Sequence, residues 1–379
     1  MNFELTEEHL NVQQAARDFA QTELLPGVIE RDNKQEFPYE QVKKLGELGF
    51  LGIMVDPKYG GSGMDTVSYV LAMEELSKVD ASASVVVSVN NSLVCWGIET
   101  YGSEEQKQKY LVPLATGKCH GAFLLSEPEA GSDATSQRTT AFDMGDHYLM
   151  NGTKNWITSG NTGTYYLVIA QTHVEKGYKG INAFIVEKSW PGVVIGKKED
   201  KMGIRGSDTH SIMFQDVKVP KENRIGEDGF GFKFAMKVLA GGRIGIASQA
   251  LGIASGAYEL ALKYSKTRKA FGKEIMHHQA IQFKLADMAT QIEAARLLCL
   301  KAAVLKDAKK DYALVSSMAK VFASETAMWV ATEAVQIHGG YGFVKEYHVE
   351  RMMRDAKITQ IYEGTSEVQR IVISREVLK

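Results

Sequence analysis

A glutamate near the carboxyl end of the chain has the surroundings that a general base needs. Glu363 stands between Tyr362 and Gly364, with the apolar Ile361 close by. A carboxylate that is partly removed from water has a raised pKa, and a base that works near neutral pH needs such an increase. Most glutamates instead lie on the solvated surface, which is the alternative for this one. Residue type and neighbours together make Glu363 a candidate catalytic base.

Two glycine-punctuated clusters earlier in the chain have residue types that bind flat ligands or phosphates. Residues 125–133 contain hydroxyls and free backbone N–H groups that suit a ring edge or a phosphate, although such a run could equally be a turn. In residues 151–160, Trp156 and Thr158 are two positions apart and would project from the same side of a strand. That pair could stack against and hydrogen-bond to a flat heterocycle; the alternative is a tryptophan in the core.

A third cluster, residues 336–343, contains the adjacent glycines Gly339 and Gly340. Paired glycines let a ligand approach the backbone closely. Arg351, Arg354 and Asp355 follow before the chain reaches the candidate base.

Several common catalytic and binding motifs are missing from the sequence. There is no G-x-G-x-x-G after a strand, no G-x-x-x-x-G-K-[ST] phosphate loop, no H-E-x-x-H metal pair and no G-x-S-x-G nucleophile. The nine histidines are scattered, so no metal site is indicated. Carboxylate acid–base or cofactor chemistry is what remains.

Composition limits the partners and the compartment. The 379 residues include 44 Lys+Arg and 46 Asp+Glu, and a net charge of −2 argues against nucleic acid. Three well-separated cysteines without a C-x-x-C fit a reducing cytosol. The acidic first residues lack the basic and then apolar run of a signal peptide, and no uninterrupted apolar stretch reaches spanning length. We therefore expect a cytoplasmic protein without a membrane partner.

The elements that must position these clusters fall into three blocks, so the fold class is α+β. The first hundred residues have helical patterns, and the last 150 are rich in Ala, Leu, Met and Lys with few breakers. Between them lie short aromatic or β-branched runs separated by turn residues, which predict strands. The expected domains are a helical domain over 1–120, a β-barrel or sandwich domain over 121–226, and a four-helix bundle over 227–379. The predicted strands cover 147–150, 165–169, 181–186 and 212–214, and the predicted bundle seam is Ile281, Leu285, Met288, Ile292 and Ala295.

Taken together, the motifs resemble those of the acyl-CoA dehydrogenase family over almost the full chain. The matching motifs are Leu-Ser-Glu-Pro with Gly-Ser-Asp, Lys-Asn-Trp-Ile-Thr, Gly-Gly-Arg-Ile-Gly-Ile-Ala, Arg-Lys-Ala-Phe-Gly, Gln-Ile-His-Gly-Gly-Tyr-Gly and Tyr-Glu-Gly-Thr, in the family's order and spacing. The resemblance implies the same three-part fold, with FAD between the β domain and the bundle.

The resemblance also implies which residues hold FAD. The flavin contacts would be Leu125, Ser126, Ser132, Trp156 and Thr158, completed by Thr365 and Glu367. A neighbouring subunit of a homotetramer, a dimer of dimers, would supply Arg268, Phe271, Gln279, Gln336, Gly339 and Gly340 to the pyrophosphate and adenine end.

By the same resemblance, Glu363 removes the α-proton of an acyl-CoA thioester while the β-hydrogen leaves as hydride to the flavin, giving the trans-2-enoyl-CoA. Gly242 stands where some relatives carry the base, so Glu363 has no rival. Ser132, Arg243 and Gly364 would contact the CoA moiety; the alternative for Arg243 is a surface ion pair. Electrons would pass to an electron-transferring flavoprotein.

The chain looks most like the short-chain, butyryl-CoA branch, which predicts C4–C6 substrates. Medium-chain or short-branched substrates, an acyl-CoA oxidase and a non-enzymatic scaffold are the alternatives. Two positions depart from the branch pattern: Ala240 replaces a usually acidic residue, and His348 replaces a proline.

Overall fold

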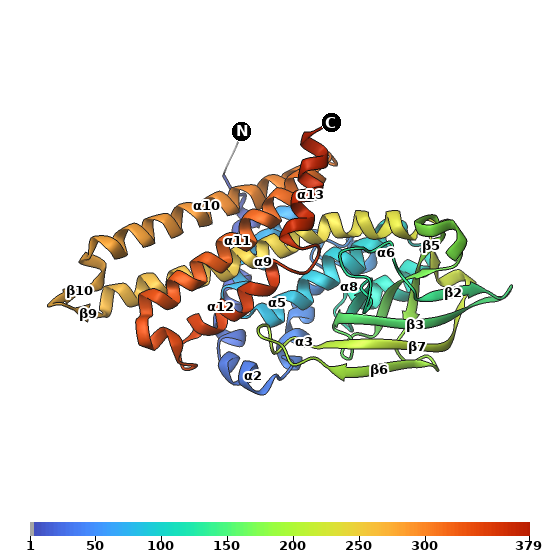
Figure 1. Cartoon of the computed structure of the whole chain (residues 1–379), viewed down its shortest axis with the longest axis horizontal. Coiled ribbons are helices and arrows are strands. Elements are labelled where there is room, and N and C mark those ends of the chain that lie inside the picture. Colours follow the sequence, from blue (N-terminus) through green and yellow to red (C-terminus); the bar gives the residue numbers. More distant parts are fainter. Residues whose placement is uncertain (1–3) are drawn as a thin grey trace.

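The computed structural model describes residues 4–379. Its first part is helical, as the sequence predicts, and Figure 1 shows these helices in blue and cyan. The first helix begins at Thr6, whose hydroxyl accepts a hydrogen bond from the His9 N–H, while the His9 ring accepts one from the Thr6 N–H. The helices are α1 (Glu7–Phe19), α2 (Val28–Lys34), α3 (Tyr39–Glu47), α4 (Thr66–Ser77), α5 (Ala81–Ser88), α6 (Trp96–Tyr101), α7 (Glu104–Gln106) and α8 (Val112–Ala115), with π-helical turns at Ala20–Leu24, Val89–Cys95 and Lys107–Leu111.

One helical stretch in this part, Ala81–Tyr101, has the length and apolar composition of a membrane span. Its most apolar window is 94% buried inside the molecule, where it packs between the N-terminal helices and the rest of the chain. Burial of this kind is what the core helix of a folded domain shows, and the hydropathy of the stretch is explained by that packing.

The middle of the chain forms a mixed sheet of eight strands in the order β6-β7-β3-β2-β4-β5-β8, with β1 parallel to β4. The four predicted strands are confirmed, as parts of β3, β4, β5 and β7. The sequence analysis missed β1, β2, β6 and β8. Strands β2 and β8 are only four and two residues long, whereas β1 and β6 contain short apolar runs, Ala122–Leu124 and Val193–Ile195, that could have marked them. The strands are β1 (Gly121–Leu124), β2 (Thr140–Asp143), β3 (His147–Thr158), β4 (Tyr165–Gln171), β5 (Ile181–Glu187), β6 (Val193–Lys198), β7 (Thr209–Pro220) and β8 (Arg224–Ile225).

The last part is a bundle built around one long helix, α9 (Gly231–Thr267), which runs from the sheet to a small hairpin at the opposite end of the molecule (Figure 1). The hairpin consists of β9 (Lys269–Ala270) and β10 (Lys273–Glu274). The other helices are α10 (Gln279–Asp307), α11 (Ala313–His338), α12 (His348–Thr359) and α13 (Ser366–Val377). The predicted seam on α10 is confirmed: Leu285, Met288, Ile292 and Ala295 are buried in the bundle core, and Ile281 packs at its edge.

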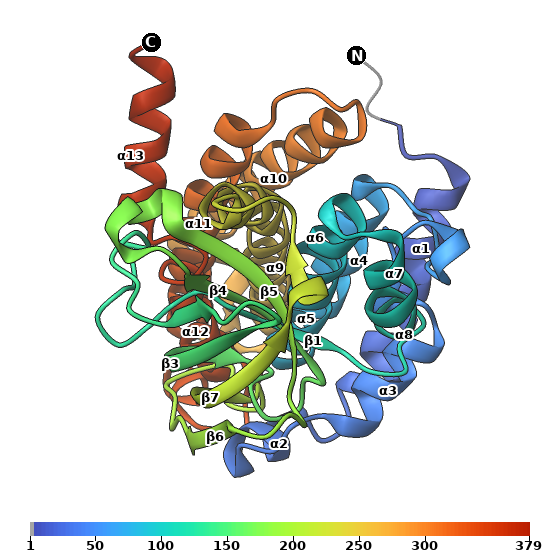
Figure 2. The same cartoon turned by 90° about the vertical axis from the view of Figure 1, so that its right-hand side faces the viewer.

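Figure 2 looks onto the sheet end of the molecule. It shows the N-terminal helices on one side of the sheet and α13 projecting away from the body on the other. Helix α9 passes behind the sheet and packs against α4, α5, α10 and α11. Gly252 lets α9 approach α4 closely, since a Cβ there would lie 2.4 Å from the Glu74 carbonyl oxygen. Helix α9 is therefore the element against which the three parts of the chain pack, and it carries one side of the candidate site.

Candidate active site

The candidate base sits in a tight turn between α12 and α13. Glu363 and Gly364 both have positive φ angles, of 52° and 93°. Glycine adopts this region freely, but a glutamate does so at a cost of roughly 1–3 kcal/mol and needs surrounding contacts to hold it. Gln369 supplies two of them, because its side-chain amide donates to the carbonyl oxygens of Glu363 (3.1 Å) and Gly364 (3.0 Å). Thr365 then caps α13 by accepting from the Val368 N–H.

The carboxylate of Glu363 lies directly against helix α9. Its Oε2 atom is buried and has no hydrogen-bond partner among residues 4–379. A Cβ placed on Gly242 would come within 2.0 Å of this oxygen and 2.6 Å of the Leu93 side chain, so only glycine leaves room for the carboxylate in its present position. The Oε2 atom of the candidate base is thus packed and free of a permanent partner, while the residue as a whole is half-buried.

Burial raises the pKa of Glu363 to about 8, against the opposing effect of two cations, Lys320 and Arg243. Desolvation disfavours the charged form of any carboxylic acid, which is the direction a base needs for proton transfer near neutral pH. Glu363 thus has the raised pKa that the sequence analysis requires of a base, and its catalytic role stays a prediction.

Arg243 is not at the surface. Its side chain is 7% exposed, and its guanidinium donates to the Ser317 hydroxyl (3.1 Å) while Nε is buried without a partner among residues 4–379. The surface ion pair weighed as an alternative for this residue is therefore wrong. The CoA contact implied by the resemblance stays a prediction.

The residue before the base ties the turn to the core. The Tyr362 hydroxyl donates to the side-chain oxygen of Gln249 on α9, and the amide of Gln249 donates to the Ala81 carbonyl at the start of α5 (2.9 Å). Ser366 donates its N–H to the Gln360 carbonyl across the turn (2.9 Å). The position of the base is thus fixed relative to both α9 and the N-terminal helices.

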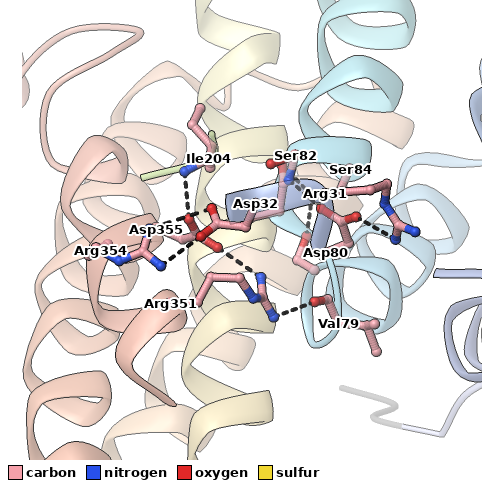
Figure 3. A network of polar contacts seen from close by, with 12 residues as sticks. Arg31, Asp32, Val79, Asp80, Ser82, Ser84, Ile204, Arg351, Arg354 and Asp355 are labelled. Carbon is pink, nitrogen blue, oxygen red and sulfur yellow. Dashed lines mark hydrogen bonds and ion pairs between the residues drawn. The ribbon is translucent and has the colours of Figure 1, made fainter. Parts of the chain in front are cut away.

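Figure 3 shows the polar network that anchors α12, the helix leading into this turn. Arg351 donates to Asp355 Oδ2 (2.9 Å), and the other oxygen of Asp355 accepts from the Ile204 N–H before β7 (2.5 Å). Arg354 donates to Asp32 on α2 (2.7 Å). Burial raises the pKa of Asp355 to about 6, with Arg351 opposing. The arginines and the aspartate noted in the sequence are therefore structural, since they join α12 to the two preceding parts of the chain.

The first two sequence clusters come together at the start of the sheet. Lys154 is fully buried and donates to the Leu125 carbonyl (3.0 Å) and to the side chains of Glu127 (2.7 Å) and Gln137 (3.2 Å). Ser126 accepts from the Asn155 N–H (2.9 Å). These bonds fasten the loop after β1 to strand β3.

Trp156 departs from the expected geometry. Its φ angle is 60°, and the pairing of β3 with β7 shifts register between Lys154 and Ile157, so strict alternation cannot be used to align Trp156 with Thr158. The indole is 61% exposed, and the alternative of a tryptophan in the core is wrong. The bulge leaves a large aromatic surface open beside the half-buried Thr158.

A second group of predicted cofactor residues lies at the other end of the molecule. A cavity of about 480 Å³ near the hairpin is lined by Arg268, Gly339, Gly340 and Tyr341, among others. Phe271 in the hairpin is 96% exposed, with a φ angle of 52°. Figure 1 shows the hairpin and the sheet at opposite ends, so one chain does not bring the two groups together.

The remaining predicted site residues lie at exposed or half-buried positions. Ser132, Gln279, Gln336 and Glu367 are exposed, while Leu125, Ser126, Thr158, Gly364 and Thr365 are intermediate. Sequence reasoning missed Lys320, Gln369 and Gln249. A lone lysine in the small-residue run of α11 was the one available signal, because the apolar face of a helix rarely carries an unpaired charge.

Three domain models of one family match the chain in order: the acyl-CoA dehydrogenase N-terminal domain at residues 6–118, the middle domain at 122–217 and the C-terminal domain at 229–378. The chain is 51% identical to the short-chain specific acyl-CoA dehydrogenase of Clostridium acetobutylicum, and the match covers 100% of both chains. It is 50% identical to a subunit of the caffeyl-CoA reductase–Etf complex of Acetobacterium woodii, over 99% of each chain. The solved butyryl-CoA dehydrogenase of Megasphaera elsdenii superposes with a TM-score of 0.99 at 51% identity, over 100% of both chains.

The chain belongs to the acyl-CoA dehydrogenase family. It is an enzyme of this family, an oxidoreductase, and it is about 50% identical to short-chain and butyryl-CoA members of the family. The expected fold, with helical, β and helical parts, is confirmed. The limits given from sequence for the three domains stay a prediction.

A Gly242→Ala variant of this acyl-CoA dehydrogenase family member tests the packing of the base. The added methyl group would displace the carboxylate of Glu363, because it would overlap Oε2. Since a shift of about 1 Å can cost roughly a hundredfold in rate, we expect turnover to fall by about ten- to a hundredfold. Gly241→Ala is the matched control, with its nearest neighbour at 3.7 Å and the same helix around it. Equal rates in the two variants, measured by steady-state assay, would contradict this packing.

Removing the carboxylate should stabilise the protein at alkaline pH. Because the folded-state pKa of Glu363 is raised from 4.5 to about 8, the protonated carboxyl favours folding below pH 4.5, and this contribution is lost as pH rises through about 8. The melting temperature of Glu363→Gln should therefore exceed that of wild type by an amount that grows from pH 5 to 8 and then levels off. Glu8→Gln, at an exposed position, is the control and should show no such trend. A pH-independent difference for Glu363→Gln would show that the carboxylate is well solvated.

Proposed function

We propose that the protein is an FAD-dependent short-chain acyl-CoA dehydrogenase that converts C4–C6 acyl-CoA thioesters to trans-2-enoyl-CoA, with Glu363 as the catalytic base. The observation that carries the proposal is the buried, partnerless Oε2 atom of Glu363, which packs on Gly242. A carboxylate held this way can accept a proton from carbon, which a solvated one in water does poorly.

Glu363 would serve the reaction through two of its groups. Its carboxylate takes the α-proton, and its backbone N–H, which has no acceptor among residues 4–379, is free to donate to the thioester oxygen as negative charge develops there. The strained turn holds donor and base in one unit, so both are oriented before substrate binds. When bound, FAD supplies the acceptor for the hydride that leaves the β-carbon.

The residues present suit FAD. The exposed indole of Trp156 offers a face for a flat ring, and the loop around Ser126 offers hydroxyl and backbone donors. At the far end, Arg268 forms no ion pair with a carboxylate of residues 4–379, and a Cβ at Gly339 or Gly340 would meet no neighbouring atom within 4 Å. An arginine without a carboxylate partner, here lying over the Tyr341 ring, and an open backbone are what a pyrophosphate needs.

The separation of the two groups supports a site shared between subunits. In the proposal, Leu125, Ser126, Ser132, Trp156, Thr158, Thr365 and Glu367 of one subunit hold the flavin, and Arg268, Phe271, Gln279, Gln336, Gly339 and Gly340 of another hold the pyrophosphate and adenine. The enzyme would then be a homotetramer, a dimer of dimers. Ser132, Gly364 and Arg243 would contact the CoA moiety.

Electron transfer and direction follow from the relatives. One relative is named as part of a complex with Etf, so an electron-transferring flavoprotein is the proposed redox partner. Because that relative is named a reductase, reduction of an enoyl-CoA is the second candidate activity. A cytoplasmic location is part of the proposal, and the three cysteines, all free thiols, agree with a reducing compartment.

Anaerobic mixing with butyryl-CoA tests the function. We expect the yellow flavin absorbance to bleach in the wild type and the rate to fall by about a thousandfold or more in Glu363→Gln, since a general base contributes roughly 10²–10⁴. FAD content serves as the control and should be equal in both proteins. Full-rate bleaching in the variant would remove Glu363 as the base. A series from C4 to C16 tests chain length, with the fastest turnover expected at C4–C6, and peroxide formed in step with turnover would indicate an oxidase instead.

Loss of the Arg268 charge should weaken cofactor retention. We expect Arg268→Met to purify with substoichiometric FAD, because a phosphate contact made by arginine is charge-assisted. Lys263→Met is the control and should keep its FAD, because Lys263 is exposed on the last turns of α9, the helix that ends just before Arg268. The ratio of flavin to protein absorbance is the measurement, and a full complement of FAD in Arg268→Met would exclude this residue from the cofactor site.

A further inference from the structure

Lys320, on helix α11, is a buried lysine that neither the sequence motifs nor the proposed mechanism uses. Its side chain is 0% exposed. Its ammonium donates to the Gly364 carbonyl oxygen (2.7 Å), which is its only hydrogen-bond acceptor among residues 4–379, and no carboxylate in that range forms an ion pair with it. An ammonium taken out of water without a bonded counter-ion destabilises a fold. A role for Lys320 in the function of the protein would explain why the fold keeps this group.

The acceptor belongs to the turn that carries the base. Gly364 follows Glu363 directly, and both residues have positive φ angles. Gln369 donates to the carbonyls of both residues, and Lys320 adds a charged donor to the second. A charge-assisted bond is about twice as strong as a neutral one. The two side chains, from α11 and α13, together hold the backbone in a conformation that a glutamate does not adopt on its own.

The charge of Lys320 also faces the base without neutralising it. Glu363 is surrounded by Lys320 from α11 and Arg243 from α9, with the hydroxyls of Tyr69 from α4 and the adjacent Tyr362 also close in electrostatic terms. Neither cation bonds to Oε2, which has no partner among residues 4–379. Burial lowers the pKa of Lys320 to about 8, and the carboxylate of Glu363 opposes that change. A cation at this position favours the ionised base but leaves its oxygen free for substrate.

We propose that Lys320 is a positioning residue for proton abstraction: its hydrogen bond to the Gly364 carbonyl holds the turn that aims Glu363, and its unpaired charge favours the ionised carboxylate. The proposal rests on the proposed function in which Glu363 is the base. Lys320 acts through the turn and touches neither substrate nor flavin in this scheme.

The experiment compares Lys320→Met, Lys320→Arg and Lys320→Gln as FAD-bound enzymes with butyryl-CoA. For Lys320→Met we expect flavin reduction to slow by about tenfold or more. The acid limb of the pH–rate profile should move to higher pH by about one unit, because loss of a facing positive charge makes ionisation of Glu363 harder. Lys320→Arg should return the limb toward its wild-type position. Substrate dissociation constant and FAD content should stay near wild type in all three.

Lys201→Met is the matched control. Lys201 also has a pKa lowered to about 8 by burial and also donates to a backbone carbonyl, that of Ser207 (2.8 Å), but it lies in the loop before β7 and does not contact the turn. It should leave the pH profile unchanged. If Lys320→Met does not fold, Lys320→Arg and Lys320→Gln test the role of the charge, because both side chains can donate a hydrogen bond and only arginine is charged. The acid limb of the pH–rate profile should then lie at higher pH in Lys320→Gln than in Lys320→Arg.

Two results would overturn the inference. One is a wild-type limb and rate in Lys320→Met, or equal limbs in Lys320→Arg and Lys320→Gln. The other is a loss of melting temperature or FAD without a shift of the limb, which would mean a purely structural role. Failure of the proposed function is seen separately, as retained flavin reduction in Glu363→Gln.

Discussion

The structure depends on a carboxylate with one oxygen, Oε2, that is buried without being neutralised by a bonded cation. Glu363 is pressed against Gly242, its Oε2 accepts no hydrogen bond within residues 4–379, and two cations face it without bonding to it. A direct salt bridge would lower the pKa and occupy the oxygen, whereas complete isolation would leave the base protonated. The arrangement lies between these limits. Because a buried carboxylate oxygen without a hydrogen bond destabilises the folded state, contacts elsewhere in the fold must offset this loss of stability.

That stability comes from three helices that meet at the turn. Helix α9 supplies the glycine surface, α11 supplies Lys320, and α12 is fixed by Arg351 and Asp355 to the loop before β7. The strained turn can persist because the carbonyls of Glu363 and Gly364 both accept from Gln369 on α13, and that of Gly364 also accepts from Lys320 on α11. A small shift of any one of these helices would move Glu363. The polar network in Figure 3 therefore matters for the geometry of the site, because it fixes α12, the helix that leads into the turn.

Sequence reasoning predicted four of the eight sheet strands and a candidate base, but it missed the contacts that position that residue. Runs such as 181–186 are marked by β-branched and aromatic residues, and Glu363 is marked by its immediate neighbours, so both are local signals. The bond from Lys320 to Gly364 joins residues 44 apart, and nothing near Lys320 in the sequence indicates its partner. The bulge at Trp156 is equally hidden, because it arises from pairing with β7, more than fifty residues later. Local patterns report residue preference, whereas register and buried pairing are set by tertiary packing.

The length of α9 bears on how the cofactor site can be completed. Its 37 residues rise about 55 Å at ~1.5 Å per residue, from the sheet to the hairpin that carries Phe271. The residues suited to the flavin lie toward the first end, and those suited to a pyrophosphate lie at the second. A dinucleotide cannot bridge that distance within one chain, and an isologous pairing of two chains would place the hairpin of each beside the sheet of the other. In the proposed assembly, Phe271, which is 96% exposed in one chain, would belong to a site that a second chain completes, and assembly would come before cofactor binding.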